Sequence, residues 1–471
     1  MRGFAEVSLT LTSDQHEQLR AHLFPGDGKE AVAVALCGRR QSADRCRLLV
    51  HEIVPIPHEL CERNVHSVKW KTEALVGVLP KAEQRGLSIL KVHSHPGGYS
   101  RFSPTDAEGD TRLFDSLESW IEGGPNVSAV MVPDGRMFGR AFFPGGFTVP
   151  VSLVTKIGDD IDLWQSALLE ENVPPDPEFA LRHIQVFGQK TFRELSRLRI
   201  AVVGCSGTGS PVVEQLARLG VGRLVLVDSD IVEEKNLNRM LNATEADVRE
   251  RAHKVDVLRR AVERMGLGTE VLAFRNDLAS PDAVRAVADC DAVFGCLDTV
   301  DGRNLLNRLA TFYLLPYFDV GVRLEADGKG GVSQVSGVVH YLRPGGDTLR
   351  DRGVYDGADL EAAALRHSDP KEYERRVGEG YIKRIREDRP AVVSINMVFA
   401  GLAVTELVAR IHPFKDDANV NYASYAASLS AGNIYTEQES SASAMWRRYL
   451  GRGDMNPLLD MPELSARPAT P

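Results

Sequence analysis

Two histidines separated by one residue are the first feature of this sequence that could perform chemistry. His93 and His95 follow a short apolar stretch, Ser88–Val92, that predicts a β-strand. Residues two apart in a strand face the same side, so both imidazoles can reach one ion. Ser103, followed by proline, predicts the N-cap of a helix whose first turn contains Asp106. Two histidines, one aspartate and an open fourth position are typical of catalytic zinc, although surface histidines beside a chance acid would look the same.

A glycine-rich turn is the second such feature. The residues GCSGTGS at 204–210 lie between an expected strand, Ile200–Val203, and an expected helix, Ser210–Leu219. A second strand, Arg223–Val227, ends on Asp228, which is the expected place for a ribose ligand. Glycines let the backbone approach phosphates, and a helix N-terminus offers unpaired N–H groups. This order predicts a nucleotide site or, alternatively, a tight structural turn.

Charged residues further along the chain discriminate between nucleotides. Arg239 and Lys254 could neutralise phosphates, and Asp298, at the end of the expected strand Ala292–Cys296, could hold magnesium. Nucleotidyl transfer to a carboxylate needs such residues because it brings two anions together. A nicotinamide-dependent dehydrogenase has no use for these cations, so the pattern favours ATP.

Composition sets further bounds on function. The chain has 471 residues and a net charge of −9, with no Lys/Arg-rich run, which argues against a nucleic-acid partner. Its N-terminus lacks the apolar core of a secretory signal. The longest apolar stretch, Val392–Leu407, contains polar residues and predicts a buried helix, so we expect no membrane span. Six cysteines in so long a chain indicate reduced thiols and a cytoplasmic location.

The order of expected strands and helices predicts an α/β chain of two domains, covering residues 1–150 and 179–436. Residues 151–178 are expected to form a polar, proline-stiffened linker with one short helix at Ile161–Leu169. Residues 437–471 are polar and predict a flexible tail or a docking segment.

The string HSHP, six residues and then SPTD resembles the signature of the JAB/MPN metalloprotease family. Members of that family cleave after the C-terminal glycine of ubiquitin and ubiquitin-like proteins. The resemblance implies an N-terminal α/β domain in which zinc-bound water attacks a carbonyl with the help of a general base. The implied residues are the zinc ligands His93, His95 and Asp106, the oxyanion-stabilising Ser103, and the general base Glu30, for which Glu52 is a distant alternative.

A second resemblance covers roughly Phe179 to Ile434. This part of the chain resembles the ThiF/MoeB superfamily, the adenylating domains related to ubiquitin-activating enzymes. The strings that carry the resemblance are the glycine loop, VDSD with NLNR, CLDTVDGR, and RPAVVSINMVFAGLAVTELV. The similarity implies a Rossmann-like adenylation domain that uses Mg-ATP, and an arginine, Arg182, that crosses into a partner's ATP site in a homodimer. The implied ATP-site residues are the phosphate loop Gly204, Gly207 and Gly209, the ribose ligand Asp228, the triphosphate ligands Asn236, Arg239 and Lys254, and the magnesium ligand Asp298; Arg182, Arg239 and Asp298 would take part in catalysis.

Two departures from that superfamily are informative. Many relatives carry Cys-x-x-Cys pairs for structural zinc, but the corresponding stretch here is Thr348-Leu349-Arg350-Asp351. Relatives that form a thioester use a later cysteine, and this sequence has none after Cys296. The activated carboxylate would pass to a separate conjugating protein or to a hydroxyl such as Thr348 or Ser368, although a solvated loop is the simpler interpretation of both.

The two resemblances together predict a bifunctional enzyme for a ubiquitin-like protein with a C-terminal glycine. The first domain would trim or release that protein, and the second would adenylate its carboxylate in a bacterial-type conjugation pathway. One alternative is activation of a sulfur-carrier protein for cofactor or amino-acid biosynthesis. Another is a modifier-binding scaffold with one inactive domain. A dehydrogenase would leave Arg239 and Lys254 unexplained.

Overall fold

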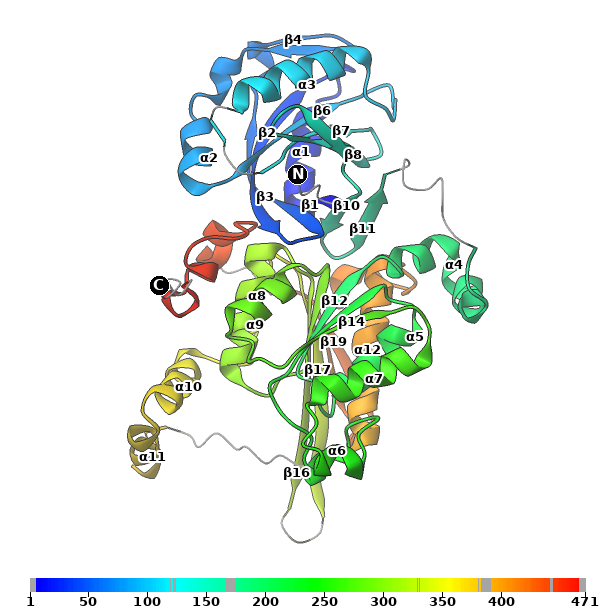
Figure 1. The fold of residues 1–471 in the computed structure, drawn as a ribbon, viewed down its shortest axis with the longest axis vertical. Coiled ribbons are helices and arrows are strands. Elements are labelled where there is room, and N and C mark those ends of the chain that lie inside the picture. The colour runs from blue at the N-terminus through cyan, green and yellow to red at the C-terminus, as the bar shows by residue number, and fades with distance from the viewer. Residues whose placement is uncertain are drawn as a thin grey trace. The chain divides into compact units, whose positions relative to one another are not determined.

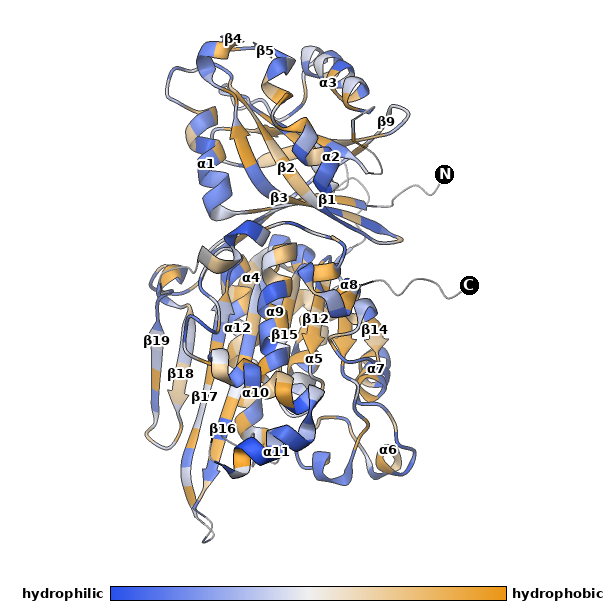
Figure 2. Ribbon diagram, turned by 90° about the vertical axis from the view of Figure 1, so that its left-hand side faces the viewer, coloured by the Kyte–Doolittle hydropathy of each residue, from blue (hydrophilic) through white to orange (hydrophobic). Residues whose placement is uncertain are grey.

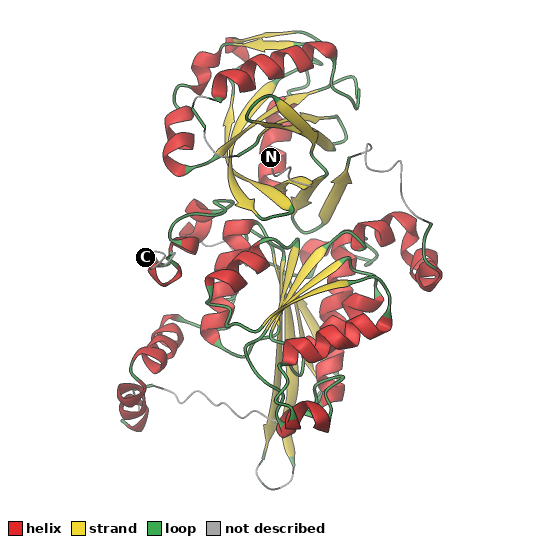
Figure 3. Ribbon diagram, viewed as in Figure 1, coloured by secondary structure: helices red, strands yellow, loops and turns green. Residues whose placement is uncertain are grey.

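The protein folds into two compact units, each with its own sheet (Figure 3). The first unit comprises Met1–Pro175, Thr311–Leu314 and Arg447–Pro471, and the second comprises Asp176–Ala310 and Leu315–Trp446. Both units are α/β, as the sequence predicts. The computed structural model describes residues 6–118, 120–121, 124–166, 175–327, 329, 331–379, 381–382, 391–440 and 444–465.

The first unit is built on a nine-stranded mixed sheet. Its elements are β1 (Glu6–Thr12), α1 (Ser13–Leu23), β2 (Val32–Gln41), β3 (Arg45–Pro55), α2 (Leu79–Arg85), β6 (Ser88–Ser94), α3 (Pro104–Leu117), β7 (Asn126–Met131), β8 (Met137–Phe143), β9 (Phe147–Pro150), β10 (Leu153–Ile157) and β11 (Ile161–Gln165), with a separate hairpin of β4 (Cys61–Arg63) and β5 (Val68–Trp70). The strand order is β11-β10-β1-β3-β2-β6-β7-β8-β9 (Figure 1).

Helices cover both faces of this sheet, which explains why its central strands are continuously apolar rather than alternating. Alternate residues of β2 belong to two hydrophobic clusters on opposite faces. One cluster includes Leu19 and Leu23 of α1, and the other includes Leu113 and Leu117 of α3. The C-terminal half of α3 is therefore held against β6 and β2 by apolar contacts.

The first unit extends beyond the boundary expected at residue 150. β10 and β11 form an antiparallel hairpin that continues the sheet from β1. The helix expected at Ile161–Leu169 is therefore wrong, because Ile161–Gln165 is strand β11. The acidic pair at 159–160 lies in the turn of this hairpin, and polar residues are as common in such turns as in linkers. Residues 167–174 of the expected linker lie outside the described residues.

Part of the expected flexible tail, residues 447–465, contributes to the first unit instead. The backbone N–H of Asp454 donates to the carbonyl of Arg39 in β2 (2.7 Å), and the N–H of Gly38 donates to the carbonyl of Gly451 (3.2 Å). A Cβ on Gly453 would lie 2.4 Å from the carbonyl oxygen of Arg39, so this approach requires glycine. Backbone pairing of this kind leaves no apolar pattern in the sequence.

The second unit contains an eight-stranded sheet in the order β14-β13-β12-β15-β16-β17-β18-β19. Its strands are β12 (Arg199–Val203), β13 (Arg223–Val227), β14 (Glu270–Phe274), β15 (Ala292–Gly295), β16 (Tyr317–Ala326), β17 (Val332–Leu342), β18 (Ser424–Ser428) and β19 (Asn433–Glu437). Its helices are α4 (Leu181–Leu195), α5 (Gly209–Arg218), α6 (Glu245–Arg249), α7 (Lys254–Met265), α8 (Pro281–Ala288), α9 (Val300–Tyr313), α10 (Gly357–Ser368), α11 (Pro370–Gly378) and α12 (Val393–Ile411).

The order of the parallel strands fixes where a ligand would bind in the second unit. From β12 the chain runs outward through β13 and β14, then returns to the other side of β12 through β15 and β16. The segments that follow β12, β13 and β15 therefore meet where the strand order reverses, which is the usual ligand site of such sheets. Figure 1 shows α8 and α9 on one face and α5, α7 and α12 on the other. Figure 2 shows β12 and β14 as mainly hydrophobic strands, in contrast to the hydrophilic α11.

α12 corresponds to the apolar stretch that predicts a buried helix. It packs against α5 and β16, and Phe399, Ala403 and Leu407 are buried. By length and composition alone α12 could cross a membrane, but 56% of its most apolar window is buried inside the protein. This burial is typical of a core helix.

Gly453→Ala should destabilise the first unit by about 3 kcal/mol, because strain at a φ of +64° adds to a clash with Arg39. Gly145→Ala is the matched control: its φ is +83° but nothing lies within 4 Å, so only about 1–2 kcal/mol of strain is expected. Trp70, Trp120 and Trp164 lie in the first unit. Urea unfolding of the full chain followed by tryptophan fluorescence therefore measures both effects, and equal losses would contradict the glycine contact.

Candidate functional site

His93, His95 and Asp106 converge in the first unit. The two Nε2 atoms of the histidines are 3.2 Å apart. Oδ1 of Asp106 lies 3.2 Å from Nε2 of His93, and Oδ2 lies 3.4 Å from Nε2 of His95. One ligand atom of each of these three residues lies within 4.8 Å of the others. In the described part of the chain, no other group of three or more His, Cys, Asp or Glu residues is this close together. Two imidazoles and a carboxylate are a donor set that fits Zn²⁺.

Local strand and helix geometry produces this convergence. His93 lies near the end of β6, and His95 follows the strand directly. α3 begins with a capping box, in which Oγ of Ser103 accepts a hydrogen bond from the N–H of Asp106 (3.1 Å) and Oδ2 of Asp106 accepts one from the N–H of Ser103 (2.7 Å). The cap places Asp106 in the first turn facing the histidines, as the sequence predicts.

Burial and hydrogen bonds set the protonation states of the three side chains. Burial lowers the pKa of His93 to about 4. Burial also opposes protonation of His95. However, Asp106 and a hydrogen bond from Nδ1 of His95 to the carbonyl of Tyr99 (2.7 Å) favour the protonated ring, and together they raise the pKa of His95. Burial opposes ionisation of Asp106, yet the bonds from both histidines hold its pKa well below the usual range. An ionised Asp106 and a His95 whose Nε2 faces the cluster suit metal binding.

Glu30, the predicted general base, precedes β2 and lies beside the same cluster. The backbone N–H of Ser94 donates to the carbonyl of Ala31 (3.0 Å), which brings Glu30 across from His95. Glu30 is 5% exposed, and among the described residues its Oε2 has no hydrogen-bond partner. Burial raises its pKa to about 7; the charge of His95 opposes this rise and that of Asp106 adds to it. A buried, unpaired carboxylate beside three metal-type ligands is suited to hold a water molecule.

The remaining two residues expected at this site have other partners. Oγ of Ser103 donates to Oδ2 of Asp106 (2.7 Å), so it helps to orient that carboxylate. Glu52, the alternative base, forms an ion pair with Lys81 of α2. The role of Ser103 toward an oxyanion and that of Glu30 toward water stay predictions.

Glu30→Gln should stabilise the metal-free protein at pH 8 by on the order of 2 kcal/mol and have little effect at pH 5. The folded-state pKa of Glu30 is about 7, above the value of 4.5 for an exposed carboxyl, so stability of the wild type falls as pH rises through this window. Glutamine mimics the protonated form. Urea unfolding at both pH values measures the difference, with Glu52→Gln as the control. An unchanged stability at pH 8 would mean that Glu30 is not an unpaired buried charge.

The second site lies at the glycine loop that follows β12. Gly204 has a φ of +88°, and a Cβ there would lie 2.5 Å from the carbonyl oxygen of Cys296. A Cβ on Gly209 would lie 1.8 Å from the carbonyl oxygen of Gly204, and one on Gly207 would lie 2.5 Å from Nδ2 of Asn396. Close packing against backbone therefore requires glycine at 204 and 209, whereas a Cβ on Gly207 would meet only side-chain atoms that can move. The loop opens onto the N-terminus of α5.

An acid and a lysine meet beside this loop. Oδ2 of Asp228 accepts a hydrogen bond from the N–H of Cys205 (2.7 Å), and Oδ1 accepts one from the N–H of Asp230 (2.9 Å). Burial raises the pKa of Asp228 despite the nearby charge of Lys254. Nζ of Lys254, the first residue of α7, pairs with Oδ2 of Asp230 (2.7 Å). Asp230 is absent from the predicted set, although the string VDSD contains it; a bound phosphate would compete with it for Lys254.

Asn236 and Arg239 differ in their surroundings. Asn236 is buried, and its Oδ1 accepts a hydrogen bond from the N–H of Glu233 (2.9 Å), so part of its side chain serves the fold. Arg239 packs over the glycine loop, with its Cδ 3.3 Å from the position of a Cβ on Gly207. The buried Asn396 of α12 also contacts Gly207 and was not predicted. Its signal is a polar residue in the first turn of a mainly apolar helix.

Asp298 and Arg182 are both exposed. Asp298 lies between β15 and α9, two residues after Cys296, whose carbonyl borders Gly204, so it is close in the chain to the glycine loop. Arg182 lies in the first turn of α4, where its Nη1 donates to Oε1 of Gln185 (3.2 Å). Magnesium binding by Asp298 and reach into a partner by Arg182 stay predictions.

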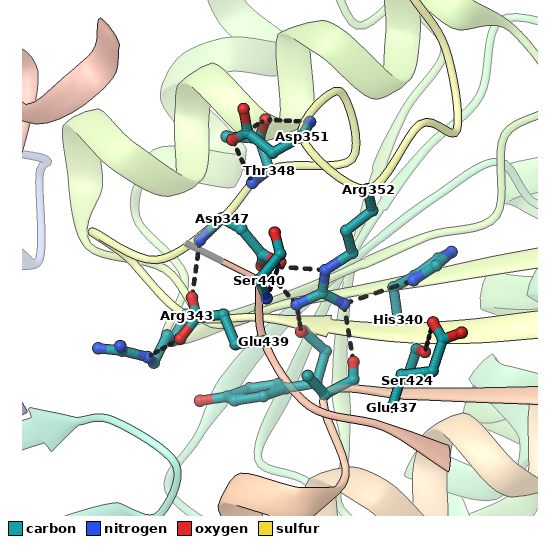
Figure 4. Close-up of polar contacts among 12 residues, drawn as sticks. His340, Arg343, Asp347, Thr348, Asp351, Arg352, Ser424, Glu437, Glu439 and Ser440 are labelled. Atoms are coloured by element: carbon teal, nitrogen blue, oxygen red, sulfur yellow. Dashed lines mark hydrogen bonds and ion pairs between the residues drawn. The ribbon is translucent and has the colours of Figure 1, made fainter. Parts of the chain in front are cut away.

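A network of polar side chains surrounds residues 347–352 (Figure 4). This stretch corresponds to the one that carries the first cysteine pair in zinc-binding relatives. Arg352 donates through Nε and Nη2 to Oδ1 of Asp347 (2.9 and 2.6 Å). Oδ2 of Asp347 accepts a hydrogen bond from the N–H of Ser440 (2.9 Å), and Oε1 of Glu439 accepts one from the N–H of Asp347 (2.7 Å). Charged hydrogen bonds thus join two segments that are distant in sequence.

The two hydroxyls considered as acceptors of an activated carboxylate are engaged. Thr348 is buried rather than solvated, and its Oγ1 donates to Oδ2 of Asp351 (2.9 Å; Figure 4). Oγ of Ser368 donates to the carbonyl of Ala364 within α10 (2.9 Å). The carboxylate of Asp351 is the one base among these contacts, but Thr348 beside it is buried, and Ser368 contacts only a backbone carbonyl.

A Rossmann-like nucleotide-binding fold, joined to an α/β domain with a His₂Asp cluster, defines the class of this protein. Residues 180–442 match the model of the ThiF family, and residues 12–143 match the model described as prokaryotic homologs of the JAB domain. The chain belongs to the ThiF family and carries a JAB-homologous domain before it. The predicted fusion is confirmed.

Curated relatives resemble parts of the chain. Adenylyltransferase and sulfurtransferase MOCS3 of Mus musculus is 39% identical over 113 residues, 24% of this chain and 24% of that protein. Ubiquitin-like modifier-activating enzyme 5 of Drosophila pseudoobscura pseudoobscura is 27% identical over 214 residues, 41% of this chain and 48% of that protein. The crystal structure of E. coli MccB with ATP has a TM-score of 0.44 at 18% identity, covering 59% of this chain and 77% of MccB. The chain spans less than half the length of both curated relatives.

Proposed function

We propose that this chain is a bifunctional enzyme for a small ubiquitin-like protein that ends in glycine. Its JAB-homologous domain would cleave after that glycine, and its ThiF domain would adenylate the exposed carboxylate with Mg-ATP. The observation that carries the proposal is the convergence of Glu30 with His93, His95 and Asp106 in a chain of the ThiF family. Both sites would act on the same flexible tail, in a cytoplasmic protein that dimerises through the ThiF domain.

In the JAB-homologous domain, His93, His95 and Asp106 would hold Zn²⁺, which when bound polarises the scissile carbonyl and acidifies water. Glu30 would accept the proton of that water at Oε2 and donate it to the leaving amine. Burial raises the pKa of Glu30 to about 7 in the metal-free protein, which favours its protonated form, and the charge of bound Zn²⁺ would favour the carboxylate that accepts a proton from water. Ser103 would turn its hydroxyl from Asp106 toward the oxyanion.

In the ThiF domain, the loop Gly204–Gly209 and the N-terminus of α5 would receive the phosphates, and Arg239 and Lys254 would neutralise them. Asp228 would bind the ribose, and Asp298 would hold Mg²⁺. The glycine carboxylate would attack the α-phosphorus of ATP, the bond from that phosphorus to the bridging oxygen would break, and pyrophosphate would leave. The product is an acyl adenylate.

Activation of a sulfur-carrier protein is the second candidate function. The name of the mouse relative includes sulfurtransferase activity, and this sequence has no cysteine after Cys296 that could hold a thioester. Both candidates share the adenylation step and differ in the protein that captures the adenylate. A scaffold without turnover would not need the complete set of ligand and cation residues at both sites.

The full chain should catalyse ATP–pyrophosphate exchange that depends on a small protein ending in glycine. Asp298→Ala should lower the exchange rate at least about 100-fold, because the acid that holds the metal is lost. Asp301→Ala is the matched control, since Asp301 is an exposed neighbour that pairs with His367. Absence of exchange with every glycine-ended partner tested would refute the adenylation proposal.

Glu30→Ala should keep its zinc and lose cleavage of a C-terminally extended ubiquitin-like substrate by about 10²–10⁴-fold. Mass spectrometry of the trimmed product measures cleavage, and elemental analysis measures zinc. Glu52→Ala should cleave at the wild-type rate because Glu52 pairs with Lys81. The reverse pattern would assign the general base to Glu52.

A further inference from the structure

α3 and β6 face each other through two matched pairs of side chains. Asp106 lies 3.2 Å from His93, and one helical turn later Asp110 lies 2.6 Å from Lys91. Lys91 and His93 are two residues apart on one face of the strand, a rise of about 6.6 Å. Asp106 and Asp110 are four residues apart on one face of the helix, a rise of about 6 Å. The spacing along the strand therefore matches the spacing along the helix. Because of this match, the pair Asp110–Lys91 sets the position of Asp106 relative to His93.

Asp110 is held from two directions. Its side chain is 0% exposed, and that of Lys91 is 10% exposed. Oδ2 of Asp110 accepts a hydrogen bond from Nη2 of Arg140 on β8 (2.8 Å). The guanidinium of Arg140 also lies 4.1 Å from the ring centre of Phe102, which immediately precedes the N-cap residue Ser103. Asp110 and Arg140 therefore tie α3 and the loop entering it to two strands of the sheet.

Apolar packing alone would not fix the height of α3 over β6. Leu113, Phe114 and Leu117 hold the helix to the sheet, but hydrophobic contacts are non-directional and permit small shifts along the helix axis. A buried carboxylate with charged donors on both oxygens allows no such shift, since sliding would leave a buried charge unpaired. The paired spacing then transmits this constraint to Asp106.

We propose that Lys91, Asp110 and Arg140 are positioning residues for the metal site of the JAB-homologous domain. They fix the height and rotation of α3 so that the carboxylate of Asp106 is presented to His93 and His95 before any ion binds. None of the three is a ligand in the His93, His95 and Asp106 cluster, and their positioning effect runs through Asp106, although the charge of Lys91 also acts on His93 and Glu30. This inference rests on the metal site in the proposed function.

The direct test is the zinc affinity of the metal-free full chain, measured by competition with a chromophoric chelator. Asp110→Asn preserves side-chain size and should weaken zinc binding about 10–100-fold. Glu108→Gln is the matched control on the exposed face of the same helix, where Glu108 pairs with Arg112 at 3.5 Å, and it should bind zinc as the wild type does. The d–d absorption spectrum of bound Co²⁺ should change in Asp110→Asn and not in Glu108→Gln.

A double-mutant cycle tests whether the pair acts as one unit. Lys91→Met should weaken zinc binding to a similar extent as Asp110→Asn. The zinc affinity of the double variant should be no lower than that of the single variant that binds zinc less tightly, because either substitution already breaks the pair. Fully additive losses would show two independent effects and would contradict the pairing argument.

Urea unfolding of each metal-free variant separates positioning from stability, and zinc titrations are made where every variant is folded. The inference would be overturned if Asp110→Asn bound zinc with the affinity of the wild type. It would also be overturned if the unfolded fraction of that variant accounted for its whole loss of zinc affinity. If Asp110→Asn does not fold, Arg140→Lys should retain more affinity than Arg140→Met, and equal affinities would overturn it. A wild-type chain that binds no zinc would instead refute the proposed peptidase site, on which this inference depends.

Discussion

The candidate peptidase site depends on one backbone pairing, between the start of β2 and the end of β6. The N–H of Ser94 donates to the carbonyl of Ala31 (3.0 Å), and the N–H of Ala31 donates to Oγ of Ser94 (2.9 Å). This pairing holds Glu30 where its carboxylate feels the charge of His95, in a buried position where Oε2 has no hydrogen-bond partner among the described residues. An unpaired buried acid is costly, so the sheet around it must supply the compensating stability.

Both sites follow the same plan, in which internal partners hold charged groups in place before a ligand arrives. Asp106 accepts hydrogen bonds from Ser103, and Lys254 pairs with Asp230. Each arrangement includes a residue in the first turn of a helix, Asp106 in α3 and Lys254 in α7. A ligand would exchange these internal bonds for its own and need not order a flexible side chain, which lowers the entropic cost of binding.

Features encoded by neighbouring residues could be predicted from the sequence, and features that depend on distant partners could not. The His-x-His pair, the cap at Ser103 and the glycine loop are local patterns, and the structure has them where the sequence predicts. The sequence does not distinguish strand from helix at Ile161–Gln165, because so short a segment has no clear period. The pairing of Asp110 with Lys91 leaves no signal until α3 is placed over β6.

The chemistry of the cysteines limits what can follow adenylation. Cys205 lies in the glycine loop and Cys296 borders it, but burial raises the pKa of Cys296 to about 12 and that of Cys205 well above its usual value. Thiols with such pKa values are almost entirely protonated near pH 7, and the thiolate is the nucleophile. Thr348 is buried and bonded to Asp351. These two thiols and the hydroxyl of Thr348 are therefore poorly suited to capture an acyl adenylate.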